Sequence, residues 1–131
     1  MVLPLEWRLF IYWLNKLKET NMKIVTKSEH TIITIGKNSI DDFFTKFSAS
    51  FVEFTNQHLI IDISENINTK IEDLLLFLKL SASHKANGTS FVIVCKGIDI
   101  DDIPEELSVV PTFIEALDML EMDAIERDLG F

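Results

Sequence analysis

The sequence is poor in the residues that mark disulfide-rich, collagen-like and low-complexity proteins. Its 131 residues include four glycines, three prolines and one cysteine. The glycine and proline counts exclude a collagen-like or low-complexity chain. The single cysteine, Cys95, excludes an intrachain disulfide, so we expect a reducing, cytoplasmic location. Apolar residues make up 47% of the chain, which is enough for one domain with a hydrophobic core.

Positive charge is also scarce, with 12 bases against 21 acids and a net charge of −9. This balance argues against a nucleic-acid partner, because a phosphate backbone needs a positive footprint, and against an anionic membrane surface. Residues 1–98 carry ten acids and eleven bases, a sum of +1, whereas residues 99–131 carry eleven acids and only Arg127, a sum of −10. The acidic segment is either a solvated surface or a docking surface for a basic partner.

Motifs for metal binding and catalysis are missing. His30, His58 and His84 lie far apart in the sequence, outside any metal-ligand spacing, and we expect His58 and His84 to be exposed. The glycines are solitary, so there is no phosphate-binding loop, and no nucleophile elbow is present. Cys95 follows an apolar run and is expected to be a small buried side chain. These absences predict a binding module without a metal or cofactor, not an enzyme.

Residues 1–21 form an N-terminal extension of distinct composition. The stretch Leu3–Leu17 is apolar and aromatic, but it is too short for a membrane span and is interrupted by Glu6 and Arg8. It also lacks the pattern of a secretory signal. The extension is either an amphipathic helix that packs on the domain, a partner or a membrane surface, or the product of an over-extended start, with translation beginning at Met22.

Residues 22–131 predict an α/β domain with the element order β-β-α-β-α-β-(α)-β-α. Strand–helix–strand alternation calls for right-handed crossovers and a partly parallel sheet. We therefore expect a mixed sheet of four to five strands with helices mainly on one face. The strands are predicted at Met22–Thr26, Thr31–Ile35, His58–Ile63, Ser90–Cys95 and Leu107–Val110.

Each predicted helix begins with a hydroxyl side chain that can cap it. Ser39 precedes the first helix, and Thr112 precedes the last. Thr69 precedes the second helix, where Glu72 completes a capping box. The second helix is expected to end at Asn87-Gly88. Helical spacing predicts a buried phenylalanine-rich stripe on the first helix, made of Ile40, Phe43, Phe44, Phe47, Phe51 and Phe54. It also predicts an inner face on the last helix, made of Phe113, Leu117, Leu120 and Ala124, with Ile125 and Leu129 as further candidates.

This order of elements, together with several short phrases, resembles the STAS domain, the SpoIIAA-like fold of bacterial anti-sigma factor antagonists. Leu59–Ser64 resembles the third strand of that family with its I-D-L-S ending, and Phe91–Val94 resembles the fourth. Leu107–Leu117 is similar to the closing strand, turn and helix, where the phrase P-T-x-x-E-A is common. The resemblance covers Met22–Leu120. The tail Glu121–Gly130 is similar to that of small bacterial STAS-like proteins, some of them labelled ribonuclease Z.

The resemblance implies partner switching, in which an unphosphorylated STAS protein binds an anti-sigma factor and phosphorylation releases it. The family's phosphorylation motif, D-S-S/T-G, falls here on residues 70–73, which contain no hydroxyl. We therefore expect a non-catalytic interaction domain without the usual phosphoserine switch. Glu72 is then either a capping residue or a partial mimic of phosphate. A displaced acceptor at Thr69 or Ser64 is the remaining option.

The expected partner is an anti-sigma factor or related regulator. The expected docking surface joins a loop to the start of the second helix: Asn66, Asn68, Thr69, Lys70, Glu72 and Asp73. A mean hydropathy of +0.21 favours a homodimer as well, through the phenylalanine-rich helix, Trp7 and Trp13. The alternatives are a nucleotide-binding STAS module and a companion or mislabelled ribonuclease Z-associated protein. Because the H-x-H-x-D-H zinc motif is absent, nuclease activity itself is not expected.

Overall fold

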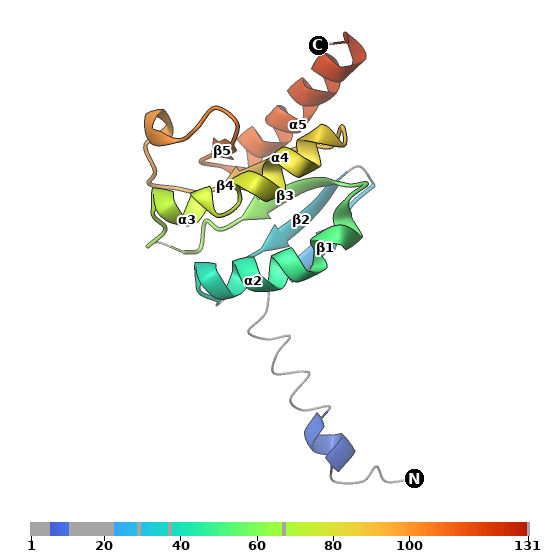
Figure 1. Ribbon diagram of the computed structural model, residues 1–131, viewed down its shortest axis with the longest axis vertical. Helices are drawn as coiled ribbons and strands as arrows, with labels where there is room; N and C mark the ends of the chain where they lie inside the picture. The colour runs from blue at the N-terminus through green and yellow to red at the C-terminus, as the bar shows by residue number, and fades with distance from the viewer. Residues whose placement is uncertain (1–5, 11–22, 29, 37, 67, 131) are drawn as a thin grey trace.

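The computed structural model of the protein describes residues 6–10, 23–28, 30–36, 38–66 and 68–130. A five-stranded sheet in the order β1-β2-β3-β4-β5 forms its centre (Figure 1). β1 is antiparallel to β2, whereas β2, β3, β4 and β5 are all parallel to one another. The α/β class and the mixed sheet are thus confirmed. The strands are β1 Lys23–Thr26, β2 His30–Thr34, β3 His58–Asp62, β4 Phe91–Val94 and β5 Ser108–Val110.

The helices lie on both faces of the sheet, with most of them on one. Right-handed crossovers between neighbouring parallel strands place α2, α3 and α4 on the same side, here named the first face. α5 follows the last strand, closes no crossover, and packs on the opposite side, the second face. The helices are α2 Ile40–Ser50, α3 Ile71–Leu75, α4 Leu78–Ala86 and α5 Phe113–Asp128, with 3-10 turns η1 Phe51–Phe54 and η2 Ile100–Asp102. Residues 6–10 are also helical.

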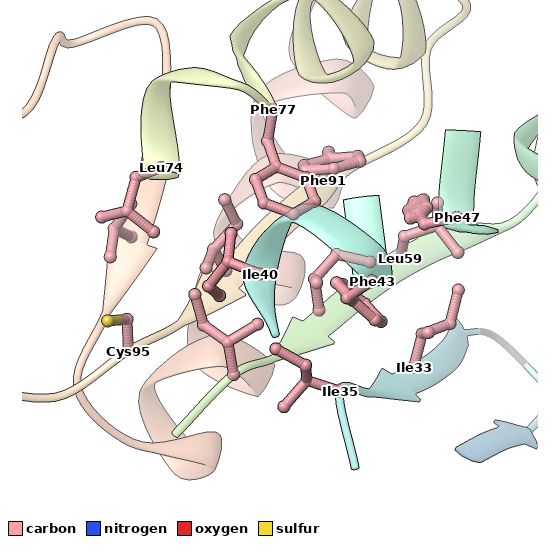
Figure 2. Close-up of a cluster of buried hydrophobic side chains, with 14 of the residues drawn as sticks. Ile33, Ile35, Ile40, Phe43, Phe47, Leu59, Leu74, Phe77, Phe91 and Cys95 are labelled. Atoms are coloured by element: carbon pink, nitrogen blue, oxygen red, sulfur yellow. The ribbon is translucent and has the colours of Figure 1, made fainter. Parts of the chain in front are cut away.

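The larger core lies between the first face and helices α2, α3 and α4 (Figure 2). Phe47 is at its centre, since its ring lies 5.7–6.5 Å from those of Phe51, Phe54, Phe77 and Phe91. The predicted stripe is confirmed as core, which leaves only parts of a few rings for the expected dimer interface. The fully buried side chains include Phe43, Phe47, Phe77, Phe91, Ile33, Leu59, Ile61, Leu74 and Ile93.

The smaller core lies between the second face and α5. Ile60 and Val92 contribute to it from the sheet, and Ala116 is the fully buried residue of α5. The predicted inner face of α5 is therefore wrong in part, because Phe113 and Leu117 are 37% and 36% exposed and the candidates Ile125 and Leu129 are 52% and 66% exposed. α5 carries apolar residues on most of its sides, so helical spacing alone did not identify the side that meets the sheet.

The first and last helices have the predicted caps. The Ser39 hydroxyl accepts a hydrogen bond from the Asp42 N–H at 3.2 Å. The Thr112 hydroxyl accepts one from the Glu115 N–H, also at 3.2 Å. Each bond satisfies a donor that the first turn of a helix leaves without a partner.

The cap predicted for the second helix is wrong by one residue. α3 begins at Ile71, and it is the carboxylate of Asp73, not Glu72, that accepts the Lys70 N–H at 3.0 Å. Thr69 does not cap the helix, because its hydroxyl donates to the Asn66 carbonyl at 3.1 Å. The single helix expected up to residue 87 is also divided after Leu75 into α3 and α4.

Candidate partner-binding site

The predicted docking surface lies at the edge of the sheet where the parallel strands end. β3 ends at Asp62, and its carboxylate accepts hydrogen bonds from the Ser64 N–H at 3.0 Å and the Ser64 hydroxyl at 2.6 Å. This short turn directs the chain away from the sheet toward α3. The Ser64 hydroxyl is therefore occupied as a donor and only partly exposed.

The loop that follows is held by side chain to main chain hydrogen bonds. The Asn66 side-chain oxygen accepts the Asn68 N–H at 3.0 Å, and the Asn66 carbonyl accepts the Thr69 hydroxyl. Burial raises the pKa of the neighbouring Cys95 thiol, and a hydrogen bond with the Thr69 side chain partly opposes that shift. Thr69 thus links the loop to the end of β4, and the loop is preorganised for contact.

Four of the six predicted binding residues divide into exposed and anchoring side chains. Lys70 and Glu72 are exposed at the start of α3, where they are free to meet a partner. Thr69 and Asp73 are half-buried, and their polar atoms hold the loop and the helix start. The structure therefore brings the predicted residues together but gives them different roles.

Two exposed apolar side chains that the sequence did not point to lie close to the predicted residues in the chain. Leu75 and Leu76 follow Lys70 and Glu72 on the same short segment and are 40% and 39% exposed. The signal was present in the sequence, because Leu74 to Leu78 is an unbroken apolar run. One face of a helix cannot bury five consecutive side chains, so some of them had to face solvent.

His84 corrects another prediction, because it is fully buried and not an exposed residue at a helix end. Its Nε2–H donates to the Gln57 carbonyl, and its ring lies 5.4 Å from Phe51 and 6.0 Å from Phe91. Burial lowers the pKa of His84 below its ordinary value, and the nearby His58 adds to this shift. The hydrogen bond to the Gln57 carbonyl opposes the shift without reversing it. His84 is therefore a neutral core residue that joins α4 to the loop before β3.

Within the described ranges, no three His, Cys, Asp or Glu side chains gather into a possible metal site. In the same part of the chain, no helix is both long and apolar enough to cross a membrane. The predicted binding residues are charged, amide and hydroxyl side chains on a hydrogen-bonded loop and a short helix, and exposed Leu75 and Leu76 follow them in the chain. Such an arrangement is suited to binding another protein surface.

Comparison with known proteins identifies the class of fold. No protein-family model and no curated protein matches the sequence. Among solved structures, the chain is similar to a serine-to-glutamate variant of RsbS from Moorella thermoacetica, a STAS-domain protein, with a TM-score of 0.57 and 17% sequence identity. The match covers 79% of this chain and 97% of that one. The protein thus has a STAS-like α/β fold, as the sequence resemblance predicted.

Proposed function

We propose that the protein is a non-catalytic docking domain for a regulatory protein, such as an anti-sigma factor or a related regulator. The observation that carries the proposal is the α3 surface, in which exposed Leu75 and Leu76 adjoin the charged Lys70 and Glu72. Apolar anchors surrounded by charged groups are characteristic of protein-binding surfaces. The similarity to RsbS agrees with this proposal at the level of the fold.

We further propose that phosphorylation does not control this docking. Residues 70–73, at the start of α3, offer no hydroxyl to a kinase. The nearby hydroxyls of Ser64 and Thr69 are both half-buried and both donate hydrogen bonds, to Asp62 and to the Asn66 carbonyl. A kinase would have to break these bonds and open the loop first.

A binding measurement with matched variants tests the docking surface. Partners are captured from the source organism, identified by mass spectrometry and purified for titration against the full chain. Leu76→Asp should weaken binding about tenfold or more, because a charge then replaces an apolar anchor at a desolvated contact. Val52→Asp makes the same kind of change at a residue that is 72% exposed in η1, and should leave affinity unchanged. Equal affinity of the wild-type and Leu76→Asp proteins would contradict the proposal.

A phosphorylation assay tests the absence of a switch. The purified partner, if it is a kinase, is incubated with the protein and ATP, and the product is analysed by mass spectrometry. Ser64 and Thr69 should remain unmodified, since their hydroxyls are held within the loop. Stoichiometric phosphate on either residue, with release of the partner, would contradict the proposal. It would show that the phosphate-accepting hydroxyl lies at Ser64 or Thr69 instead of within residues 70–73.

A further inference from the structure

The second face of the sheet is only partly covered by the described residues. α5 packs chiefly against β3, β4 and β5. The strand register places Val25 of β1 opposite Ile32 of β2, on the same side as α5. Both side chains, and that of Thr34, are half-buried. Val25 and Ile32 therefore form an apolar strip beside α5 that is only partly covered, with Ile32 packed against the margin of the second core.

A groove of about 740 Å³ opens beside this strip, between α5 and the amino ends of β2 and β3. We name it the amino-end groove. On its α5 side, Leu117, Leu120 and Ala124 form an apolar stripe at helical spacing that is flanked by charged side chains, and its strand side carries His30 and His58. It lies on the opposite face of the sheet from α3, so it is separate from the proposed partner-binding surface. The remaining lining residues are Ser28, Asn56, Glu121 and Arg127.

The N-terminal helix of residues 6–10 carries three large apolar side chains that are more than half exposed. Trp7, Leu9 and Phe10 are 58%, 58% and 52% exposed. Trp7 and Phe10 are three residues apart, so they lie on one side of the helix. Aromatic side chains of this size contribute strongly to association when they enter an apolar pocket.

We propose that the amino-end groove is the docking site of residues 6–10 of the same chain. Residues 11–22 join Phe10 to Lys23, the first residue of β1, which borders the partly covered strip. These twelve residues span up to about 40 Å when extended, which reaches across the second face. Because the tether is short, the effective concentration of the helix at the groove is on the order of millimolar.

Charge favours this occupant over a second copy of α5. Residues 1–22 carry three bases and two acids, whereas α5 carries six acids and one base. A dimer formed through two α5 helices would bring twelve acids together and would be opposed by repulsion. The proposed occupant, residues 6–10, carries one acid, Glu6, and one base, Arg8, so it brings no net charge to the acidic helix and avoids this repulsion.

The fluorescence of Trp7 tests the proposal in the full chain. Trp13→Phe leaves Trp7 as the only tryptophan. Docking predicts a blue-shifted emission and several-fold weaker quenching by acrylamide than in a free peptide of residues 1–22 with the same substitution. Leu117→Asp, on the groove side of α5, should remove both differences. Ile114→Asp, at a residue of α5 that is 72% exposed and outside the groove, should leave both unchanged.

Each alternative outcome has a distinct signature. Emission and quenching equal to those of the free peptide would overturn the proposal, as would equal effects of the two α5 variants. If circular dichroism shows that Leu117→Asp is unfolded, Ala124→Lys at the same groove replaces it. Protection of Trp7 that appears only with a concentration-dependent dimer, measured by light scattering, would make a second copy the donor of the helix and would overturn docking within one chain.

Discussion

The two faces of the sheet differ in how completely they are covered. On the first face, α2, α3 and α4 cover a large core in which the rings of Phe43, Phe47 and Phe77 are fully buried. On the second face, α5 covers a small core, leaves apolar residues exposed on its own surface and leaves Val25 and Ile32 of the sheet half-buried. The difference indicates that the first face provides most of the stability, whereas the second face retains surface for further contacts.

The largest expected effect comes from the centre of the first face. Phe47→Ala should lower the free energy of unfolding by about 3–5 kcal/mol, because it leaves a cavity among several rings. Leu120→Ala, in the half-buried part of the second core, should cost roughly 2 kcal/mol or less. Urea unfolding of both variants measures the contrast. Equal losses would mean that the two faces are equally important for stability.

The pH dependence of stability should report on the first face through His84. Burial holds its folded-state pKa below the ordinary value of 6.5. Below about pH 6.5 the unfolded chain therefore binds a proton that the folded chain does not, and stability falls as the pH falls. Urea titrations at about pH 7.5 and about pH 5.5 should show this loss. His84→Met should reduce the dependence; an unchanged dependence would assign it to other groups.

Removing the capping hydroxyl of α2 or of α5 makes the same kind of change on each face of the sheet. Ser39→Ala and Thr112→Ala each remove a cap bond of 3.2 Å and should each cost about 1 kcal/mol. Their effects on hydrogen exchange should differ. Ser39→Ala should accelerate exchange throughout the sheet, because α2 belongs to the main core. Thr112→Ala should accelerate exchange chiefly in α5, since that helix opens with less loss of core. Uniform acceleration by both would remove the distinction.

The smallest expected effect concerns the acidic outer surface of α5. Glu121, Glu126 and Asp128 are exposed, so replacing them with Gln, Gln and Asn should change stability by no more than about 0.5 kcal/mol. Asp123 is left intact, because it faces Lys85 of α4. If the surface is merely solvated, partner capture by the variant should also be unchanged. Loss of a basic partner would identify a second docking surface.

The sequence predicted those features of the fold that depend on local rules. The capping hydroxyls of Ser39 and Thr112, the phenylalanine stripe of α2 and the buried strand β4 follow from capping and periodicity. The site was predicted less well. For the proposed docking surface, which stays a prediction, the sequence pointed to the loop and the start of α3 but not to the exposed Leu75 and Leu76, since an unbroken apolar run does not show which residues face outward.

Other features depend on contacts between distant parts of the chain. His84 is buried, and the carbonyl of Gln57, 27 residues away, accepts a hydrogen bond from its Nε2–H. No local sequence pattern predicts that contact. The orientation of α5 depends on the side of the sheet that the preceding helices leave free. Its sequence, with apolar residues on most sides, is compatible with several orientations. Expectations for residues 1–5 and 11–22, including Trp13 and the start at Met22, lie outside the described residues.

One interaction at the margin of the sheet has a consequence for solubility. β5 is three residues long and pairs with β4 on one side only, so its other side is an edge to which a foreign strand could add. Lys85 reaches this margin from α4 and donates to the Glu106 carbonyl at 2.8 Å and the Ser108 hydroxyl at 3.0 Å. A charged ammonium beside so short an edge disfavours strand addition. We therefore expect Lys85 to disfavour self-assembly of the chain into extended sheets.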